Sequence, residues 1–156
     1  MTVLIVGSGG QVGRALIERA GADARGLDRA SCDICDQSSV ARVLDATDLS
    51  MVVNCAAYTA VDRAESDRTQ AFAVNEQGAR VVARAAWQRG LPIIHLSTDY
   101  VYAGGGNGPH CEDEPAAPLN VYGESKAGAM PRWQRQIRNT FCCAFHGCSV
   151  CMAATS

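Results

Sequence analysis

Tyr122 and Lys126 have the residue types and the spacing that most directly suggest chemistry. If a helix begins near Asn120, a separation of four residues places both side chains on one helix face. A lysine ammonium beside a phenol favours the phenolate and lowers the tyrosine pKa. Tyr122 would then serve as a general acid that gives a proton to a carbonyl oxygen while a hydride arrives at the carbon. The alternative is an exposed pair on a helix surface, since this spacing often occurs by chance.

Thr98 is a third candidate for the same chemistry. It follows the apolar stretch 92–97, which predicts a short strand that ends at this point. A hydroxyl at the end of that strand could hydrogen-bond the carbonyl oxygen that Tyr122 protonates. The Tyr–Lys spacing gains its specificity from this strand end and from a glycine loop earlier in the chain.

The glycine loop consists of Gly7, Gly10 and Gly13, between an apolar stretch at residues 2–6 and a helical pattern that begins at Gln11. In a dinucleotide site the first glycine makes a tight turn, the second lets the backbone approach a pyrophosphate, and the third lets helix pack on strand. The helix N-terminus then offers N–H groups to the phosphates. A glycine-rich turn in any α/β protein is the alternative, but the strand and the helix on either side favour dinucleotide binding.

Asp28 stands at the end of a second predicted strand, residues 24–28. A carboxylate at that position can bond the ribose 2′-hydroxyl and favours NAD. Arg29 beside it could instead meet a 2′-phosphate. The sequence therefore leaves the choice between NADH and NADPH open.

Strands and helices that alternate along the chain must position these residues. The predicted strands cover residues 2–6, 24–28, 51–57 and 92–97, and the predicted helices cover residues 11–19, 38–46 and 67–89. A stretch rich in glycine and proline, 103–119, predicts irregular backbone. This order predicts an α/β fold, a Rossmann-like doubly wound parallel sheet covered on both faces.

Composition excludes several classes of protein. The chain has 156 residues, of which 47% are hydrophobic and 19% are charged, as in an ordinary globular domain. A net charge of -2 without a basic stripe gives no reason to expect nucleic acid. The first apolar run is too short for a membrane span and lacks the features of a signal peptide, so we expect a cytoplasmic protein without a membrane partner.

Eight cysteines raise the question of a metal site. Cys32-x-x-Cys35 and Cys148-x-x-Cys151 have the spacing of two halves of a zinc site. Without a secretory signal, a disulfide framework is not expected. Four of the eight cysteines crowd into the last fifteen residues, where a different origin, described below, accounts for them, so no metal site is predicted.

Several segments resemble the dTDP-4-dehydrorhamnose reductase family, within the extended short-chain dehydrogenases/reductases, in order and spacing. They are the glycine loop, residues 54–62 (NCAAYTAVD), 64–66 (AES), 73–75 (AVN), 97–102 (STDYVY), 118–123 (PLNVYG) and the Ser125–Lys126 pair. The resemblance runs from residue 1 to about 128. It implies an NAD(P)-binding Rossmann domain at 1–128 and the NADPH- or NADH-dependent reduction of the 4-keto group of a dTDP-linked 6-deoxysugar.

The resemblance also implies roles by matched position. Thr98, Tyr122 and Lys126 would be the catalytic trio, Thr98 and Asp99 would face the sugar, and Lys126 would hold the nicotinamide ribose. Some family members use Mg²⁺ at a dimer contact, so a homodimer is allowed. The implied cofactor-binding residues are Gly7, Gly10, Gln11, Val12 and Gly13 at the phosphates, Asp28, Asp33 and Ile34 at the adenosine, and Ala57, Tyr58 and Thr59 along the middle of the cofactor.

Two alternatives share this scaffold. The regulatory subunit of methionine adenosyltransferase is similar to these reductases, binds a dinucleotide and acts by association. A different nucleotide-sugar reductase or epimerase is the other alternative. Turnover of a keto sugar with NAD(P)H would separate an enzyme from a regulatory subunit.

The last part of the chain, 129–156, does not resemble the family. The family continues with another helix, another strand and a smaller sugar-binding domain, so the resemblance implies a truncated fold whose C-terminal substrate domain is missing. Neither strand alternation nor a helix face is evident in this tail, and we expect it to be irregular. We also expect weak or no turnover, and aggregation through uncovered apolar surface.

A change of reading frame near residues 126–130 would explain this tail. If the last base of each codon is read with the first two of the next, some products are forced by the genetic code. Trp133–Gln134 gives Ala, Met152–Ala153 gives Gly, and the junctions at Cys142 give Leu on both sides. These residues suit the family's next helix and strand. A leucine codon of the family's frame that ends in TG supplies the first two bases of a cysteine codon in the shifted frame. This accounts for the cysteines in the tail.

Overall fold

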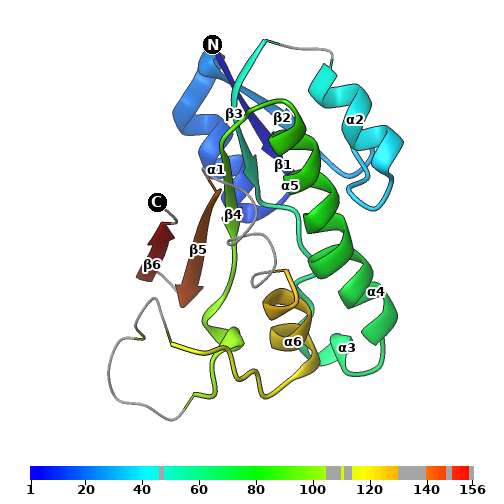
Figure 1. Ribbon diagram of the computed structural model, residues 1–156, viewed down its shortest axis with the longest axis vertical. Coiled ribbons are helices and arrows are strands. Elements are labelled where there is room, and N and C mark those ends of the chain that lie inside the picture. Colours follow the sequence, from blue (N-terminus) through cyan, green and yellow to red (C-terminus); the bar gives the residue numbers. More distant parts are fainter. Residues whose placement is uncertain (46–47, 105–109, 111–113, 130–139, 147–148, 155–156) are drawn as a thin grey trace.

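The computed structural model describes residues 1–156 apart from 46–47, 105–109, 111–113, 130–139, 147–148 and 155–156 (Figure 1). A six-stranded sheet of order β2-β1-β3-β4-β5-β6 forms the centre of the described part. All neighbouring strands pair in parallel except β5 and β6, which are antiparallel. The strands are β1 (Thr2–Val6), β2 (Ala24–Leu27), β3 (Leu49–Asn54), β4 (Ile93–Leu96), β5 (Thr140–His146) and β6 (Ser149–Ala154).

The helices follow the strands in the order that the sequence predicts. They are α1 (Gln11–Ala20), α2 (Gln37–Asp45), α3 (Val61–Ala64), α4 (Arg68–Phe72), α5 (Ala79–Gln88) and α6 (Val121–Ala127), with short 3₁₀ turns η1 (Gly21–Asp23) and η3 (Asp99–Val101). The helix predicted at 67–89 is present, but its middle, η2 (Ala73–Gly78), has π-helical geometry. The predicted α/β class and Rossmann-like sheet are therefore confirmed.

Side-chain alternation along the strands assigns the helices to the two faces of the sheet. Leu4, Val6 and Leu27 are buried with residues of α2 and α5 in one apolar cluster. Gly26 points the other way because neighbouring strand residues face opposite sides. A Cβ built on Gly26 would lie 2.9 Å from Cδ1 of Ile17, which places α1 over that opposite face. The sheet is thus covered from both sides near β1 and β2, and α2 and α5 lie together along one of them (Figure 1).

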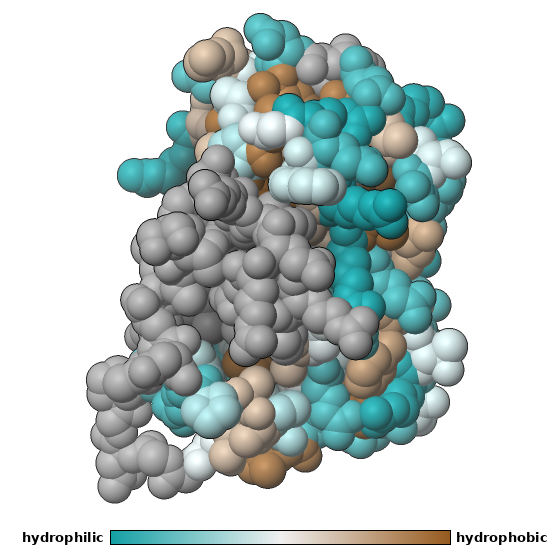
Figure 2. Space-filling model, in the orientation of Figure 1, coloured by the Kyte–Doolittle hydropathy of each residue, from teal (hydrophilic) through white to brown (hydrophobic). Residues whose placement is uncertain are grey.

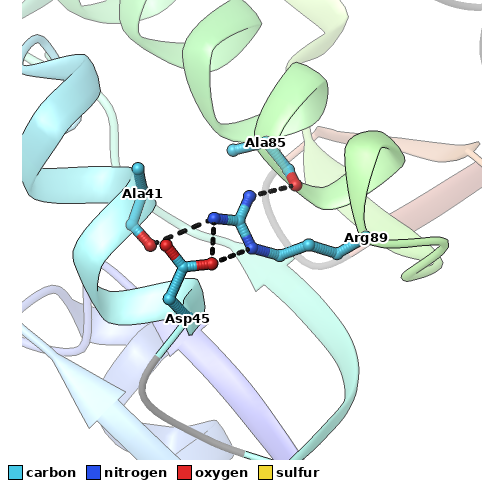
Figure 3. A network of polar contacts seen from close by, with 4 residues as sticks. All are labelled: Ala41, Asp45, Ala85 and Arg89. Carbon is cyan, nitrogen blue, oxygen red and sulfur yellow. Dashed lines mark hydrogen bonds and ion pairs between the residues drawn. The ribbon is translucent and has the colours of Figure 1, made fainter.

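Arg89, just after α5, ties that helix to α2 (Figure 3). Its Nε donates to Oδ1 of Asp45 over 2.9 Å, and its Nη2 contacts the same carboxylate oxygen. The remaining guanidinium N–H groups donate to the carbonyl oxygens of Ala85 and Ala41. A planar guanidinium suits this arrangement because it offers five donors in one fixed plane. The two helices that cover one face of the sheet are therefore also held to each other.

The expectation of an irregular tail is wrong for residues 140–146 and 149–154, which form β5 and β6. β5 pairs in parallel with β4, from Ile93 opposite Thr140 to Leu96 opposite Cys143. A strand in the interior of a parallel sheet does not need polar residues at alternate positions. The absence of alternation was therefore no evidence against a strand. Pairing also satisfies the backbone groups at the edge of β4, which would otherwise be left open.

The surface of the described residues is mainly hydrophilic in the view of Figure 2, where apolar residues form separate small areas. Within the described part of the chain, the large apolar side chains that are exposed are Met1, Val12, Trp87, Tyr100 and Leu119. Among the helices that the structure describes, none has the length and the apolar character that crossing a bilayer requires.

Candidate active site

The carboxyl ends of β1, β3 and β4 surround a cavity of about 750 Å³. This volume lies within the range of small-molecule and cofactor sites. Most residues that the sequence assigned to a cofactor line the cavity, and so do Tyr122 and Lys126. The assigned cofactor residues that line it are Gly7, Gly10, Gln11, Val12, Gly13, Asp33, Ile34, Ala57, Tyr58 and Thr59, whereas Asp28, Thr98 and Asp99 are not among the lining residues.

The glycine loop turns tightly between β1 and α1. Gly7 has a φ of 85°, and a Cβ at this position would lie 2.5 Å from the backbone nitrogen of Ala56. A Cβ on Gly13 would lie 2.4 Å from the carbonyl oxygen of Gly7. Both contacts are too short for any residue with a side chain, so the loop needs glycine at these positions for packing. Gly10 is the N-cap of α1, and the first residues of that helix face the cavity.

Asn120 starts the helix that carries the Tyr–Lys pair. Its side chain accepts a hydrogen bond of 2.7 Å from the backbone N–H of Gly123, which is an N-cap interaction, and α6 begins at the next residue. The predicted start of this helix near Asn120 is confirmed. Glu65 adds a second restraint, because its carboxylate accepts from the backbone N–H of Val121 over 2.9 Å.

Tyr122 and Thr98 are both buried and share a hydrogen bond that opposes the effect of burial on the tyrosine. Burial nevertheless raises the pKa of Tyr122, and the neighbouring Asp99 and Tyr100 raise it further. Tyr100 packs edge-on against Tyr122 with ring centroids 5.7 Å apart. The prediction that this pKa is lowered is therefore wrong. Tyr122 is held as a neutral phenol, which is the form that donates a proton.

The position of Lys126 explains why the pKa of Tyr122 is raised and not lowered. Its side chain is only 2% exposed, and its Nζ donates a hydrogen bond of 2.5 Å to the carbonyl oxygen of Leu96. The ammonium is thus directed at the end of β4, and its charge acts on two other groups, one within β4 and one just after β3. It lowers the pKa of His95, which burial already holds well below 6.5, and it partly offsets the burial that raises the pKa of Cys55 to about 11.

Thr98 and Asp99 lie immediately beside this pair. Thr98 Oγ1 donates to Oδ1 of Asp99 over 3.2 Å and accepts from the backbone N–H of Tyr100 over 3.3 Å. Thr98 is the N-cap residue of η3, and the capping bond fixes its hydroxyl near the phenol. The structure therefore brings together Thr98, Asp99 and Tyr122 from two segments that are more than twenty residues apart.

Asp28 and Arg29 follow β2, and of the two only Arg29 lines the cavity. Oδ1 of Asp28 accepts from the backbone N–H of Ser31 over 2.9 Å and from its hydroxyl over 2.7 Å. These bonds lower the pKa of Asp28. Arg29 lines the cavity, together with Cys32 and the predicted adenosine residues Asp33 and Ile34. A Cβ on Gly78 would lie 2.8 Å from Ile34, so this loop rests against the π-helical segment.

Asn75 is a residue to which the sequence assigned no function. It lies within η2, is 1% exposed, and makes three side-chain hydrogen bonds. Its Oδ1 accepts from the backbone N–H of Tyr58 over 2.8 Å, and its Nδ2 donates to the Tyr58 carbonyl over 3.0 Å and to the Ser125 hydroxyl over 2.9 Å. The Ser125 hydroxyl donates in turn to the Tyr122 carbonyl over 2.7 Å. Asn75 thereby joins the cofactor side of the cavity to α6.

Cys32, Cys35 and Cys55 are free thiols. Within the described part of the chain, no group of three or more histidine, cysteine, aspartate or glutamate side chains is arranged to hold a metal ion. The side chains of Cys148 and Cys151, the other half of the zinc alternative, lie outside the described residues.

The family model of the RmlD substrate binding domain matches residues 1–136. This chain belongs to that family. The match continues eight residues beyond the end of the resemblance that the sequence motifs indicated, at about residue 128.

Several known proteins similar to the chain are dTDP-4-dehydrorhamnose reductases. A dTDP-4-dehydrorhamnose reductase of Sinorhizobium fredii is 42% identical over 128 residues, which are 81% of this chain and 43% of that protein. One of Streptomyces griseus is 43% identical over 126 residues, or 79% of this chain and 41% of that protein. The crystal structure of a dTDP-4-dehydrorhamnose reductase from Bacillus anthracis in complex with NADP is 34% identical, with a TM-score of 0.88, and the similarity covers 92% of this chain and 53% of that one. The chain thus spans less than half the length of these curated relatives.

Proposed function

We propose that this chain is the cofactor-binding and proton-donating part of a dTDP-4-dehydrorhamnose reductase. The reaction is the NAD(P)H-dependent reduction of the 4-keto group of dTDP-4-dehydro-L-rhamnose in dTDP-L-rhamnose biosynthesis. The observation that carries the proposal is the buried Thr98–Tyr122 hydrogen bond beside a cavity that the glycine loop also lines. The names of the similar proteins agree with this chemistry.

The residues around the cavity fit a nicotinamide dinucleotide. Gly7 and Gly13 lie so close to neighbouring backbone that any side chain would force the loop to shift. Gly10, Gln11 and Val12 present the start of α1 to the cavity. A helix N-terminus of this kind favours phosphate groups. Asp33 and Ile34 would hold the adenosine, and Ala57, Tyr58 and Thr59 the middle of the cofactor. When bound, NADH or NADPH supplies the hydride.

The chain's own residues would handle the proton. Tyr122 would donate its phenolic proton to the oxygen of the 4-keto group. The Thr98 hydroxyl, whose single proton goes to Asp99 without substrate, would donate to the same keto oxygen instead. A raised pKa suits this role because it keeps Tyr122 protonated at neutral pH. Lys126, which is buried and lines the cavity, would hold the nicotinamide ribose. Asp99, which accepts from Thr98, would face the sugar.

A pair of measurements on this chain tests the proposal. Fluorescence titration should show binding of NADPH or NADH, and single-turnover reactions at high protein concentration should show weak conversion of dTDP-4-dehydro-L-rhamnose. Tyr122→Phe should keep cofactor binding and abolish the conversion. Absence of binding to either dinucleotide would sink the proposal. Binding without conversion of any dTDP-4-keto sugar would favour a regulatory subunit instead, and robust conversion would contradict the expectation that a further sugar-binding domain is required.

A further inference from the structure

The proposed chemistry uses neither of two buried polar side chains, Asn54 and His95. Asn54 is the last residue of β3 and His95 lies within β4, and both are at most 1% exposed. They are register partners in the parallel pairing of these strands, so their side chains lie on the same face of the sheet. Burying polar groups is costly unless they are hydrogen-bonded, so such a pair must satisfy its own donors and acceptors.

The hydrogen bonds of Asn54 determine where His95 carries its proton. Oδ1 of Asn54 accepts from the backbone N–H of Ala56 over 3.1 Å. This contact fixes the orientation of the amide, so its amino group, Nδ2, is the atom that lies 3.2 Å from Nδ1 of His95. An amide amino group only donates, so Nδ1 accepts and the neutral imidazole carries its proton on Nε2. Burial and the charge of Lys126 hold the pKa of His95 well below 6.5, which keeps the ring neutral at pH 7.

The bond to Ala56 matters because this residue belongs to a stretch of irregular backbone, residues 55–59, that lines the cavity. The stretch lies against the glycine loop, since a Cβ built on Gly7 would be 2.5 Å from the backbone nitrogen of Ala56. That nitrogen is the group whose hydrogen Asn54 accepts. The buried amide therefore fixes how the start of the stretch lies against the loop.

We propose that His95 is a positioning residue for the proposed dinucleotide site. By accepting from Asn54, it holds that amide in the orientation that anchors residues 55–59 beside the glycine loop. The inference rests on the proposed function, because the middle of the cofactor would lie along this stretch. Asn75 anchors the same stretch further along, at both backbone groups of Tyr58, so a change at His95 should loosen only the end next to the loop.

The side chain at position 95 must offer an acceptor where Nδ1 of histidine lies. With an apolar side chain there, the amino group of Asn54 stays buried and unpaired, or the amide rotates and gives up its bond to Ala56. Leucine is such a side chain and is close to histidine in size. Asparagine at position 95 keeps the acceptor, because its Oδ1 is attached to Cγ as Nδ1 is in histidine.

The test measures the dissociation constants of NADPH and NADH by fluorescence titration of the 156-residue chain, at a temperature where circular dichroism shows every variant to be folded. His95→Leu should weaken both cofactors about tenfold, the effect of one lost buried hydrogen bond, and His95→Asn should stay within about threefold of the original chain. Ile93→Ala is the matched control, because Ile93 is equally buried on the same face of β4 and is not among the cavity-lining residues. It should lower the free energy of unfolding and leave both affinities unchanged.

Nitrogen-15 NMR of the imidazole rings gives a second readout, which a loss of stability does not change. In the original chain at pH 7, His95 should have a protonated Nε2 and an unprotonated Nδ1. A proton on Nδ1 would overturn the inference, because the ring could then not accept from Asn54.

The binding outcomes separate the inference from the proposed function. If His95→Leu binds the cofactors as tightly as the original chain, or loses no more affinity than His95→Asn, the inference is overturned while the proposed function stands. An equal loss in Ile93→Ala would also overturn it, since destabilisation of β4 would then be the cause. If the original chain is folded and binds neither cofactor, the proposed function itself fails.

Discussion

Replacing Asn75 by alanine perturbs the connection between the cofactor side of the cavity and the catalytic helix. The variant removes three hydrogen bonds to Tyr58 and Ser125 at a position that is 1% exposed. Each bond contributes about 1 kcal/mol, and a buried group left without its partner adds to the cost. We therefore expect the free energy of unfolding to fall by about 3–4 kcal/mol.

Urea unfolding followed by circular dichroism measures this change. Thr69→Ala, an exposed position on α4, is the control and should change stability by less than about 0.5 kcal/mol. A double-mutant cycle of Asn75→Ala with Ser125→Ala should give a coupling of about 1 kcal/mol, because one hydrogen bond joins these side chains. NADPH affinity should also fall, since Tyr58 lines the cavity. A loss below about 1 kcal/mol for Asn75→Ala would refute the reasoning.

Three further predictions follow from packing and charge. Gly7→Ala should destabilise the fold and abolish dinucleotide binding, because its Cβ would meet the backbone of Ala56. Gly21 also has a positive φ but faces open space, so Gly21→Ala should lower the free energy of unfolding by only about 1 kcal/mol and leave dinucleotide binding unchanged. Arg89→Ala should lower the free energy of unfolding by about 1–2 kcal/mol in urea titrations, since α2 and α5 lose their shared ion pair. The pKa of His95 is depressed, so below pH 6.5 the unfolded chain binds a proton at this residue that the folded chain does not bind. The free energy of unfolding should therefore decrease as the pH is lowered below 6.5, and His95→Gln should make this decrease smaller.

Local rules allowed the glycine loop and the start of α6 to be predicted from the sequence. The turn at Gly7 and the close approach at Gly13 depend on residues within a few positions, and the same holds for the cap at Asn120. The order of strands and helices then fixed which loops meet, because the carboxyl ends of parallel strands lie at one edge of the sheet. For this reason the cavity contains most of the residues that the sequence assigned to a cofactor.

Predictions that depend on where a side chain points were less successful. Four-residue spacing places Tyr122 and Lys126 on one face of α6, but it does not reveal that the lysine reaches the carbonyl of Leu96, thirty residues earlier. Burial then determines the pKa of Tyr122. The role of Asp28 at the adenosine end stays a prediction, and the structure adds that its Oδ1 accepts two hydrogen bonds from Ser31. Asn75 gave no signal, since its partners lie 17 and 50 residues away.

The strand β5 bears on the predicted change of reading frame. Codons for Ile, Leu, Val and Phe carry thymine as their second base. In the frame that encodes this tail, that thymine becomes the first base of a codon for Phe, Leu, Ser, Tyr, Cys or Trp, or of a stop codon. Phe141, Cys142, Cys143 and Phe145 have codons of this kind. A family strand read out of frame would therefore stay largely apolar, and aromatic residues among the products favour strands.

The existence of β5 is thus compatible with the frame change, which stays a prediction about the coding DNA. Sequencing that DNA should reveal a second frame, beginning near the codon for Lys126, that encodes an apolar strand over the codons of β5 and continues in the manner of the family. An alternative frame that is closed by stop codons, or that encodes nothing similar to the family, would contradict it. The tail would then be a genuine extension of the domain, and β5 and β6 would be its own solution to the open edge of β4.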